Sequence, residues 1–217
     1  MKTIRITGVG HSSISPNQIE LNFDLKTLEL DYNKSLEKHD LKLNEFNLIL
    51  KKLNFKKEDL KTNYFNISPR YRNYRQNDGN YKEIFEGYEV SQSLILTFDY
   101  NMSILDKIIA ELSKSNIKPR FNISFTIKEK EDFKNKILEN ACVDARKKAQ
   151  ILANACNQKI LGIVSIDYSF SDIHLYSSTR YDTNYECCKS KMSSIGSSIT
   201  PTDIESSENV TFVFEIE

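Results

Sequence analysis

A run of arginines alternating with aromatic residues, Pro69-Arg70-Tyr71-Arg72-Asn73-Tyr74-Arg75, is the strongest candidate for binding chemistry in this sequence. Because successive side chains of a β-strand point to opposite faces, an extended run places Arg70, Arg72 and Tyr74 on one face and Tyr71, Asn73 and Arg75 on the other. Aromatic rings stack on bases and guanidinium groups bind phosphates, which is compatible with a site for nucleic acid or another polyanion. The other interpretation is an exposed hairpin tip whose charges discourage pairing between strand edges. A third candidate partner is an acidic segment of a neighbouring chain.

The histidines and cysteines do not predict a metal site. His11, His39 and His174 lie far apart in the sequence, whereas a structural zinc site needs closely spaced ligands. His39 falls on the apolar side of a helical pattern, which favours a packed or interface histidine. Cys187 and Cys188 are adjacent in a polar stretch, and adjacent cysteines can bind soft metals or oxidise, but no second pair lies nearby. We therefore expect no metal and no other cofactor.

The glycines near the N-terminus do not predict a nucleotide site. Gly8-x-Gly10 lacks the third glycine of a dinucleotide-binding fingerprint and is followed by Pro16 rather than by a helix. A turn or a β-bulge is the expected role of these glycines. The sequence also lacks the short motifs of serine hydrolases, P-loop proteins and zinc proteases, and its carboxylates form no recognisable acid–base pair. We therefore predict no catalytic residues and no enzymatic activity.

A stripe of small residues follows the third helical pattern, from Glu131 to Cys156. Alanines recur at steps of four, at positions 141, 145, 149 and 153. Small side chains permit close approach of another element, and core packing within the chain is favoured over a subunit interface. Cys142 and Cys156 lie on the same helix and are predicted to be small buried core residues.

The hydrophobic periodicity predicts an α+β fold, in which antiparallel or mixed sheets, a long β-hairpin and three main helices position these candidates. Strands are expected over 2–8, 19–25, 64–75, 88–98, 121–127, 161–170 and 209–216, and helices from Asp31 to near Asn54, over 102–115 and over 131–156. The hairpin turn is expected at Asn77-Asp78-Gly79-Asn80. A polar, serine-rich loop over about 171–207 is predicted to be mobile, because such long loops are usually functional or disordered.

Two stretches of the sequence echo each other. Asp31-Tyr32-Asn33 opens the first helix and Asp99-Tyr100-Asn101 the second, and Phe-Asn-Ile-Ser follows each helix, at 65–68 and 121–124. Asp or Asn at a helix start accepts hydrogen bonds from the free N–H groups of the first turn. Capping and composition explain the echo as well as a duplicated strand–helix–strand unit does, and both interpretations stay open.

Length and composition indicate one sizeable domain over residues 1–217. The chain has 217 residues, 39% of them hydrophobic, and a formal net charge of zero, which argues against a general coat for nucleic acid. No stretch approaches the roughly 20 apolar residues of a membrane-spanning helix. The segment after Met1 also lacks the apolar run of a signal peptide, which predicts a cytoplasmic protein.

The charges are unevenly distributed along the chain. Residues 51–82 hold nine Lys/Arg and three Asp/Glu, whereas residues 203–217 hold five acids and no base. Opposite charges of this kind favour a head-to-tail contact between copies, and such a contact closes into a ring if its rotation permits. Long strands also need partners or protection. We therefore expect a homo-oligomer larger than a dimer, with a monomer whose hairpin folds back over its helices as the alternative.

Several short motifs form an ordered set along nearly the whole chain. In chain order they are Ile6-x-Gly8-x-Gly10 with Pro16, Gly87-Tyr88-x-Val90-x-Gln92, Ala141-x3-Ala145-Arg146-x2-Ala149-x2-Leu152-Ala153, Ile160-Leu161-Gly162-Ile163-Val164, Ile199-x-Pro201 and Val210-x-Phe212-x-Phe214-x-Ile216. In this order they resemble the SIMPL domain family (signalling molecule associated with the mouse pelle-like kinase), formerly a domain of unknown function. The chain departs from the family pattern at Asn17, at Asn157 and at Pro201-Thr202, although Asn at 157 still tolerates the left-handed conformation that ends a helix.

The resemblance implies an α+β fold, an inclination to form ring-like or channel-like oligomers and a link to stress response or signalling. It implies no established catalytic residues. Many bacterial relatives are exported, and because no leader is apparent after Met1, we do not expect their periplasmic roles to carry over to this chain. The sequence therefore predicts a non-enzymatic assembly or interaction protein. The alternative is a binder of nucleic acid or another polyanion through the hairpin around Arg70 to Arg75.

Overall fold

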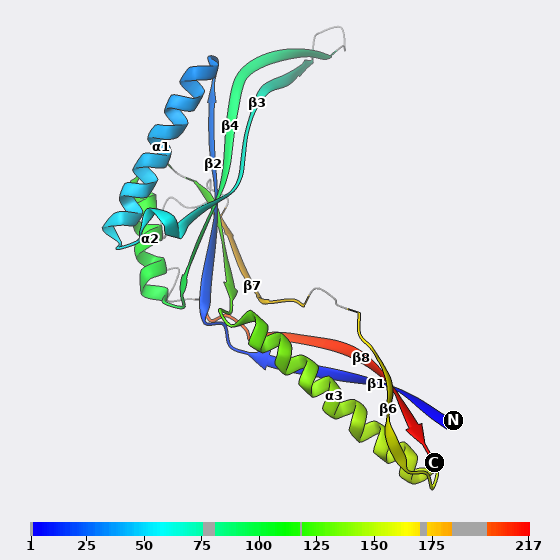
Figure 1. The fold of residues 1–217 in the computed structure, drawn as a ribbon. Helices are drawn as coiled ribbons and strands as arrows, with labels where there is room; N and C mark the ends of the chain where they lie inside the picture. Colours follow the sequence, from blue (N-terminus) through cyan, green and yellow to red (C-terminus); the bar gives the residue numbers. More distant parts are fainter. Residues whose placement is uncertain (1, 76–80, 118, 170–172, 184–198) are drawn as a thin grey trace. The chain divides into compact units, whose positions relative to one another are not determined.

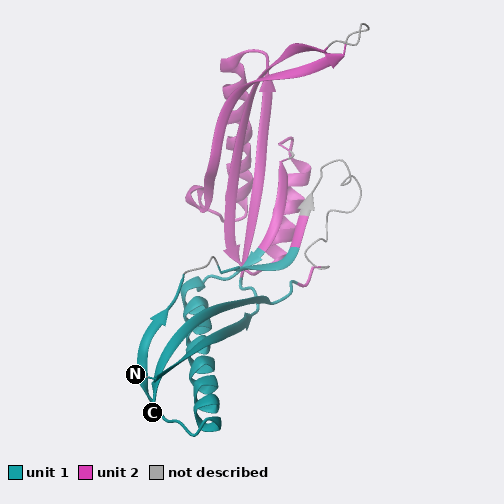
Figure 2. Ribbon diagram, turned by 90° about the vertical axis from the view of Figure 1, so that its right-hand side faces the viewer, with its two compact units in different colours: residues 1–17, 125–179, 201–217 teal, residues 18–124, 180–200 magenta. Residues whose placement is uncertain are grey.

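The protein, seen in a computed structural model, is described here for residues 2–75, 81–117, 119–169, 173–183 and 199–217 (Figure 1). The predicted α+β fold is confirmed, with antiparallel strand pairs and three α-helices in this described part. The described residues divide into two compact units (Figure 2). Unit 1 comprises residues 1–17, 125–179 and 201–217, and unit 2 comprises residues 18–124 and 180–200. The single domain predicted over 1–217 thus contains two units, each discontinuous in sequence.

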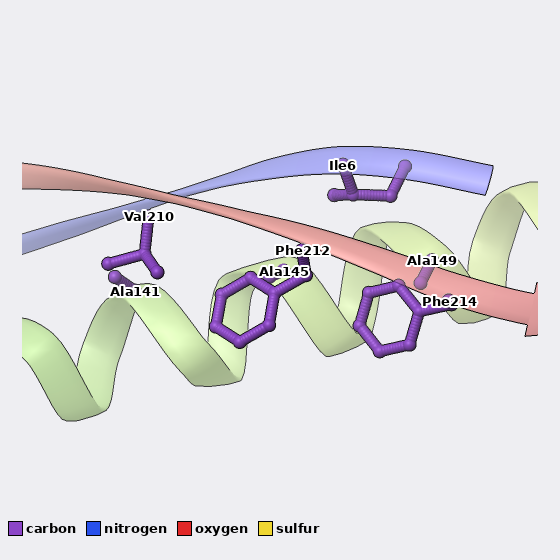
Figure 3. Close-up of a cluster of buried hydrophobic side chains, with 7 residues drawn as sticks. All are labelled: Ile6, Ala141, Ala145, Ala149, Val210, Phe212 and Phe214. Atoms are coloured by element: carbon purple, nitrogen blue, oxygen red, sulfur yellow. The ribbon is translucent and has the colours of Figure 1, made fainter. Parts of the chain in front are cut away.

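Unit 1 has a three-stranded sheet in the order β1-β8-β6, with one helix on one face. The elements are β1 (Lys2–Ile14), β8 (Ile204–Ile216), β6 (Ile160–Asp167) and α3 (Lys130–Ala155). The stripe of alanines on α3 faces the large apolar side chains of β8, as Figure 3 shows for Val210, Phe212 and Phe214. All of these side chains are buried. The prediction that the stripe is core of the chain itself is confirmed.

Gly8 and Gly10 allow α3 to approach β1 closely. The pairing of β1 with β8 runs without interruption from Lys2 opposite Ile216 to Ile14 opposite Ile204, so the expected turn or bulge at the glycines is wrong. A Cβ atom on Gly8 would lie 2.1 Å from the carbonyl oxygen of Ala141, and one on Gly10 would lie 1.9 Å from that of Ile137. The helix backbone occupies the space of a side chain at both positions.

Polar side chains of α3 also hold β1. The carboxylate of Asp144 accepts a hydrogen bond of 2.8 Å from the backbone N–H of Val9 and pairs with the Lys148 ammonium group at 2.7 Å. The hydrogen bond from Lys148, followed by the one from Val9, lowers the pKa of Asp144. This contact is therefore present at neutral pH and is lost as the pH falls through that lowered pKa.

Of the predictions for the end of α3, one is confirmed and one is wrong. Asn157 adopts the left-handed conformation, with φ of 54°, as expected for the residue that ends this helix. Cys142 is half-buried against the alanine cluster, but Cys156 is exposed at the helix C-cap. Cys156 is therefore not a core residue, because α3 ends there and residues 154–156 are exposed.

Unit 2 contains two successive strand–helix–strand segments. The first is β2 (Gln18–Glu29), α1 (Tyr32–Lys52) and β3 (Leu60–Arg75), with the short 3-10 helix η1 (Lys57–Asp59) before β3, and the second is β4 (Tyr81–Asp99), α2 (Met102–Lys114) and β5 (Arg120–Thr126). These strands form a sheet with β7 (Tyr176–Thr183), of which residues 180–183 fall in unit 2, in the order β3-β4-β2-β5-β7. Both helices lie on one face of this sheet (Figure 1). The core between the sheet and the helices includes Phe23 of β2 and Phe46 of α1, whose ring centroids are 4.9 Å apart.

The two segments share an architecture, but the echoed residues do not play matching parts. The side chain of Asp31 caps α1 by accepting a hydrogen bond from the N–H of Lys34. The cap of α2 is Asn101, which accepts from the N–H of Ile104. Asp31 corresponds to Asp99 in the echo, so the second cap lies two residues later than the echo places it. A side chain thus caps the start of both helices, as expected, but the two caps occupy different positions of the echoed sequence.

The polar loop predicted over 171–207 is partly wrong. Residues 176–183 form β7, and β8 begins at Ile204 rather than near Asn209. Polar residues in these strands obscured their alternation, because the side chain of Ser177 is buried and donates a hydrogen bond to the carbonyl oxygen of Thr202. Residues 171–172 and 184–198 of the predicted loop, including Cys187 and Cys188, lie outside the described residues. In the described part, no helix combines the length and the apolar character needed to cross a membrane.

A buried polar relay joins α1 to the sheet of unit 2. His39 is 1% exposed, and its Nε2 lies 2.9 Å from Oε1 of Gln92, with Nδ1 3.4 Å from the hydroxyl of Thr27. The amide of Gln92 in turn donates to the hydroxyl of Thr62 at 2.8 Å. His39 is thus the packed histidine that the sequence favoured, and each buried group in the relay has a partner.

Because buried polar groups are costly when left unpaired, Gln92→Leu is expected to lower the free energy of unfolding by about 1–3 kcal/mol. The double variant His39→Leu/Gln92→Leu is expected to cost less than the sum of its two single variants, since both members of the central hydrogen bond are then apolar. Urea denaturation of the four proteins checks this. Additive costs, or a Gln92→Leu variant as stable as the parent, would show that the relay contributes nothing.

Candidate functional site

The predicted binding residues lie in a two-stranded ribbon, which we call the arm. It consists of residues 70–75 of β3 paired with residues 81–87 of β4. The third strand, β2, ends at Glu29 opposite Tyr88, so the arm continues beyond β2 as two strands only (Figure 1). The long hairpin predicted from the sequence is confirmed in its two strands, and its predicted turn at 77–80 lies outside the described residues.

A β-bulge marks the base of the arm. Arg70 pairs with Gly87 and Tyr71 with Phe85, which leaves Glu86 as an extra residue on β4. Gly87 has φ of +135°, and a Cβ atom there would lie 2.4 Å from the carbonyl oxygen of Glu29. Only glycine fits this conformation without strain. The bulge therefore sets the position at which the ribbon separates from the rest of the sheet.

One side of the arm is aromatic. Strand alternation places six residues on this aromatic face: Tyr71, Asn73, Arg75, Tyr81, Glu83 and Phe85. The rings of Tyr71 and Phe85 meet edge to face with centroids 5.6 Å apart, and Phe85 meets Tyr88 in the same way at 5.4 Å. Tyr71 is nevertheless 55% exposed and Tyr81 70% exposed. The aromatic face is thus ordered by ring contacts and remains accessible to a partner.

The other side of the arm carries ion pairs. The guanidinium group of Arg70 contacts the carboxylates of Glu86 at 3.2 Å and Glu89 at 2.7 Å, and that of Arg72 contacts Glu86 at 3.3 Å. The shared contact with Glu86 confirms that Arg70 and Arg72 lie on one face, as the sequence predicted. Sequence reasoning missed the glutamates, so it overestimated the positive charge that the arm offers to a ligand.

These ion pairs influence the titration of Glu89. Partial burial acts to raise the pKa of this carboxyl, but the hydrogen bond from Arg70 and the positive charges of Lys26 and Arg70 together lower it below the usual value. A lowered pKa in the folded state means that the interaction stabilises the fold at neutral pH and is lost as the pH falls through that pKa. Because the arginine side chains of these pairs are more than half exposed, the pairs contribute little to stability.

Two of the histidines line one polar cleft in unit 1, which sequence reasoning missed. His11 and His174, 163 positions apart, face a cleft of about 690 Å³ together with Glu205 and Glu208 of β8. No short motif marks the cleft, because its lining comes from β1, from β8 and from residues 173–174, which are far apart in the sequence. Within the described ranges, no group of three or more His, Cys, Asp or Glu side chains is arranged to hold a metal ion.

Comparison with known proteins identifies a family across nearly the whole chain. The model of the SIMPL family, described as a protein of unknown function (DUF541), matches residues 4–214 and so includes residues of both units. No curated protein matches the chain.

Proposed function

Because this chain belongs to the SIMPL family, whose description assigns no function, we propose from its structure that it is a non-enzymatic assembly protein. It associates with further copies of itself, and the arm is the part that makes the contact. One observation carries this proposal: the arm has only two strands, and its apolar side chains are exposed. Two-stranded ribbons are marginally stable in water, and a partner packed over the aromatic face would stabilise this one.

The charge pattern supports contact with protein rather than with nucleic acid. Arg70 and Arg72 are already paired with Glu86 and Glu89 of the same arm. A phosphate backbone would have to break these pairs before it could use the two arginines. An apolar protein surface would leave them intact and bury the aromatic face instead.

Hydrogen exchange at the arm tests the proposal. We expect the backbone amides of residues 71–75 and 81–85 to exchange slowly at a protein concentration of about 100 μM. They should exchange faster after hundredfold dilution, because dissociation exposes a marginal two-stranded ribbon. The amides of β2 serve as the internal control, since the core of unit 2 covers them at every concentration. Exchange from the arm that is fast and independent of concentration would contradict the proposal.

The polyanion alternative has a test of its own. We expect no measurable binding of the protein to single- or double-stranded nucleic acid at low salt, because the available positive charge on the arm is reduced by its own glutamates. The alternative would gain support from binding that weakens with salt and whose salt dependence flattens in Arg70→Ala/Arg72→Ala/Arg75→Ala. Fluorescence anisotropy at several salt concentrations provides the measurement.

A further inference from the structure

The sheet of unit 1 has an apolar strip that α3 does not cover. Residues Ile160, Ile163 and Ile166 of β6 pair with Ile216, Phe214 and Phe212 of β8, and the register shifts at two points between them. Opposed side chains of antiparallel strands point to the same face, so every third residue of β6 lies on the helix side of the sheet. The helix packs mainly over β1 and β8. As a result, Ile163 remains 42% exposed and Ile166 55% exposed.

A cleft lies along this strip, and we call it the trough. It has a volume of about 430 Å³ and is lined by Arg146 and Gln150 of α3, by Ile160, Gly162 and Ile163 of β6, and by Phe214 of β8. Its floor is apolar, and one wall carries the guanidinium group of Arg146. Among the described residues, Arg146 has no acidic partner.

The strand that bounds the trough lacks the protection usual for a sheet edge. In the sheet order, β6 is an edge strand, and its only charged residue is the last one, Asp167. Leu161 and Val164, the residues at the two register shifts, are 56% and 45% exposed. Edge strands in monomers commonly carry lysines or inward-pointing charges that discourage contact. The absence of such charges along the strand from Ile160 to Ile166 favours a surface that is covered by a partner.

The aromatic face of the arm and the trough both present apolar side chains, and they carry exposed charges of opposite sign in Glu83 and Arg146. The aromatic face presents Tyr71, Tyr81 and Phe85 around one exposed acid, Glu83, for which the described residues supply no ion pair. The one cation of this face, Arg75, lies at the end of β3, opposite Tyr81. The trough presents branched apolar side chains beside one exposed cation, Arg146. Burial of aromatic rings on aliphatic residues supplies affinity, and a carboxylate beside a guanidinium group fixes the alignment.

We propose that the arm of one copy packs its aromatic face into the trough of a second copy, with Glu83 pairing with Arg146 of that copy. This inference rests on the proposed function and specifies the contact that produces assembly. Because the arm and the trough are different surfaces, the contact is heterologous. Each copy therefore binds one neighbour through its arm and another through its trough, which generates a ring or an open filament.

Charge reversal tests the contact with little risk to the fold, since Glu83 and Arg146 are both exposed. Glu83→Arg alone and Arg146→Glu alone each place like charges in every contact, and we expect each to weaken association about tenfold or more. In an equal mixture of the two variants, every contact between unlike copies has opposite charges again. The mixture and the double variant Glu83→Arg/Arg146→Glu are therefore expected to return to within about twofold of the parent affinity.

Sedimentation velocity over a dilution series measures these affinities, with Glu37→Arg on the exposed side of α1 as the matched control. If the parent associates but the single reversals leave its affinity unchanged, the arm–trough contact is wrong while the proposed function stands. If the single reversals weaken association and neither the mixture nor the double variant recovers, the pairing of Glu83 with Arg146 is overturned. A parent protein that stays monomeric would overturn the proposed function together with this contact.

Discussion

Gly10→Ala is expected to lower the free energy of unfolding by about 1–3 kcal/mol, because it inserts a methyl group where the backbone of α3 already lies. The added Cβ atom would lie 1.9 Å from the carbonyl oxygen of Ile137 and 2.7 Å from the backbone nitrogen of Ala141. Both neighbours belong to a helix that is held in register by its stripe of alanines, so neither can move alone. The helix would have to shift away from β1 and loosen the core shown in Figure 3.

Gly162→Ala is the matched control for this prediction. It changes the same residue type in a strand of the same sheet, but nothing lies within 4 Å of the added Cβ atom. We expect it to be neutral or slightly stabilising, since alanine restricts the unfolded chain. Urea denaturation at low protein concentration, where association contributes little, compares the two. Equal stability of Gly10→Ala and Gly162→Ala would refute the close-approach role assigned to the glycine pair.

Tyr71→Ser/Phe85→Ser is expected to reduce self-association by a factor of at least about one hundred, because buried aromatic side chains at the centre of an interface commonly contribute about 2 kcal/mol or more each. The stability of unit 2 should change little, since both residues lie in the arm, beyond the end of β2. Light scattering over a concentration series measures association, and thermal unfolding measures stability.

Tyr64→Ser provides the control for the arm variant. Tyr64 lies in the same strand as Tyr71 and has the same exposure of 55%, but it is outside the arm. A general effect of removing an exposed aromatic side chain would appear in both proteins. Loss of association confined to the arm variant would support the arm as the contact, whereas equal association of the two variants would exclude it.

The sequence allowed much of the fold to be predicted, because caps and periodicity are local properties. The first helix follows its Asp31 cap, and the helices end near Asn54 and Asn157, both in the left-handed conformation. The β7 strand was missed because its polar residues are satisfied by hydrogen bonds to a distant segment, as Ser177 shows with Thr202. Local periodicity cannot reveal such a strand.

The candidate site was predicted in position but not in charge. Counting outward from the expected turn centred on Asp78 would have placed Arg70 near Glu86, and the structure pairs them. The ion pair between Arg70 and Glu86 was therefore predictable from the register of the hairpin. The trough, by contrast, could not be predicted, because Ile163 and Ile166 read as ordinary strand residues. Their exposure results from two register shifts and from the path of α3, which only the tertiary structure contains.

The mass of the particle in solution tests the central claim, self-assembly through the arm, most directly. Light scattering on the unmodified protein at micromolar concentrations is predicted to give a mass greater than that of two chains, which decreases on dilution. The single chain has a mass of 25.2 kDa. A mass near that value, unchanged as the protein is concentrated, would contradict the account.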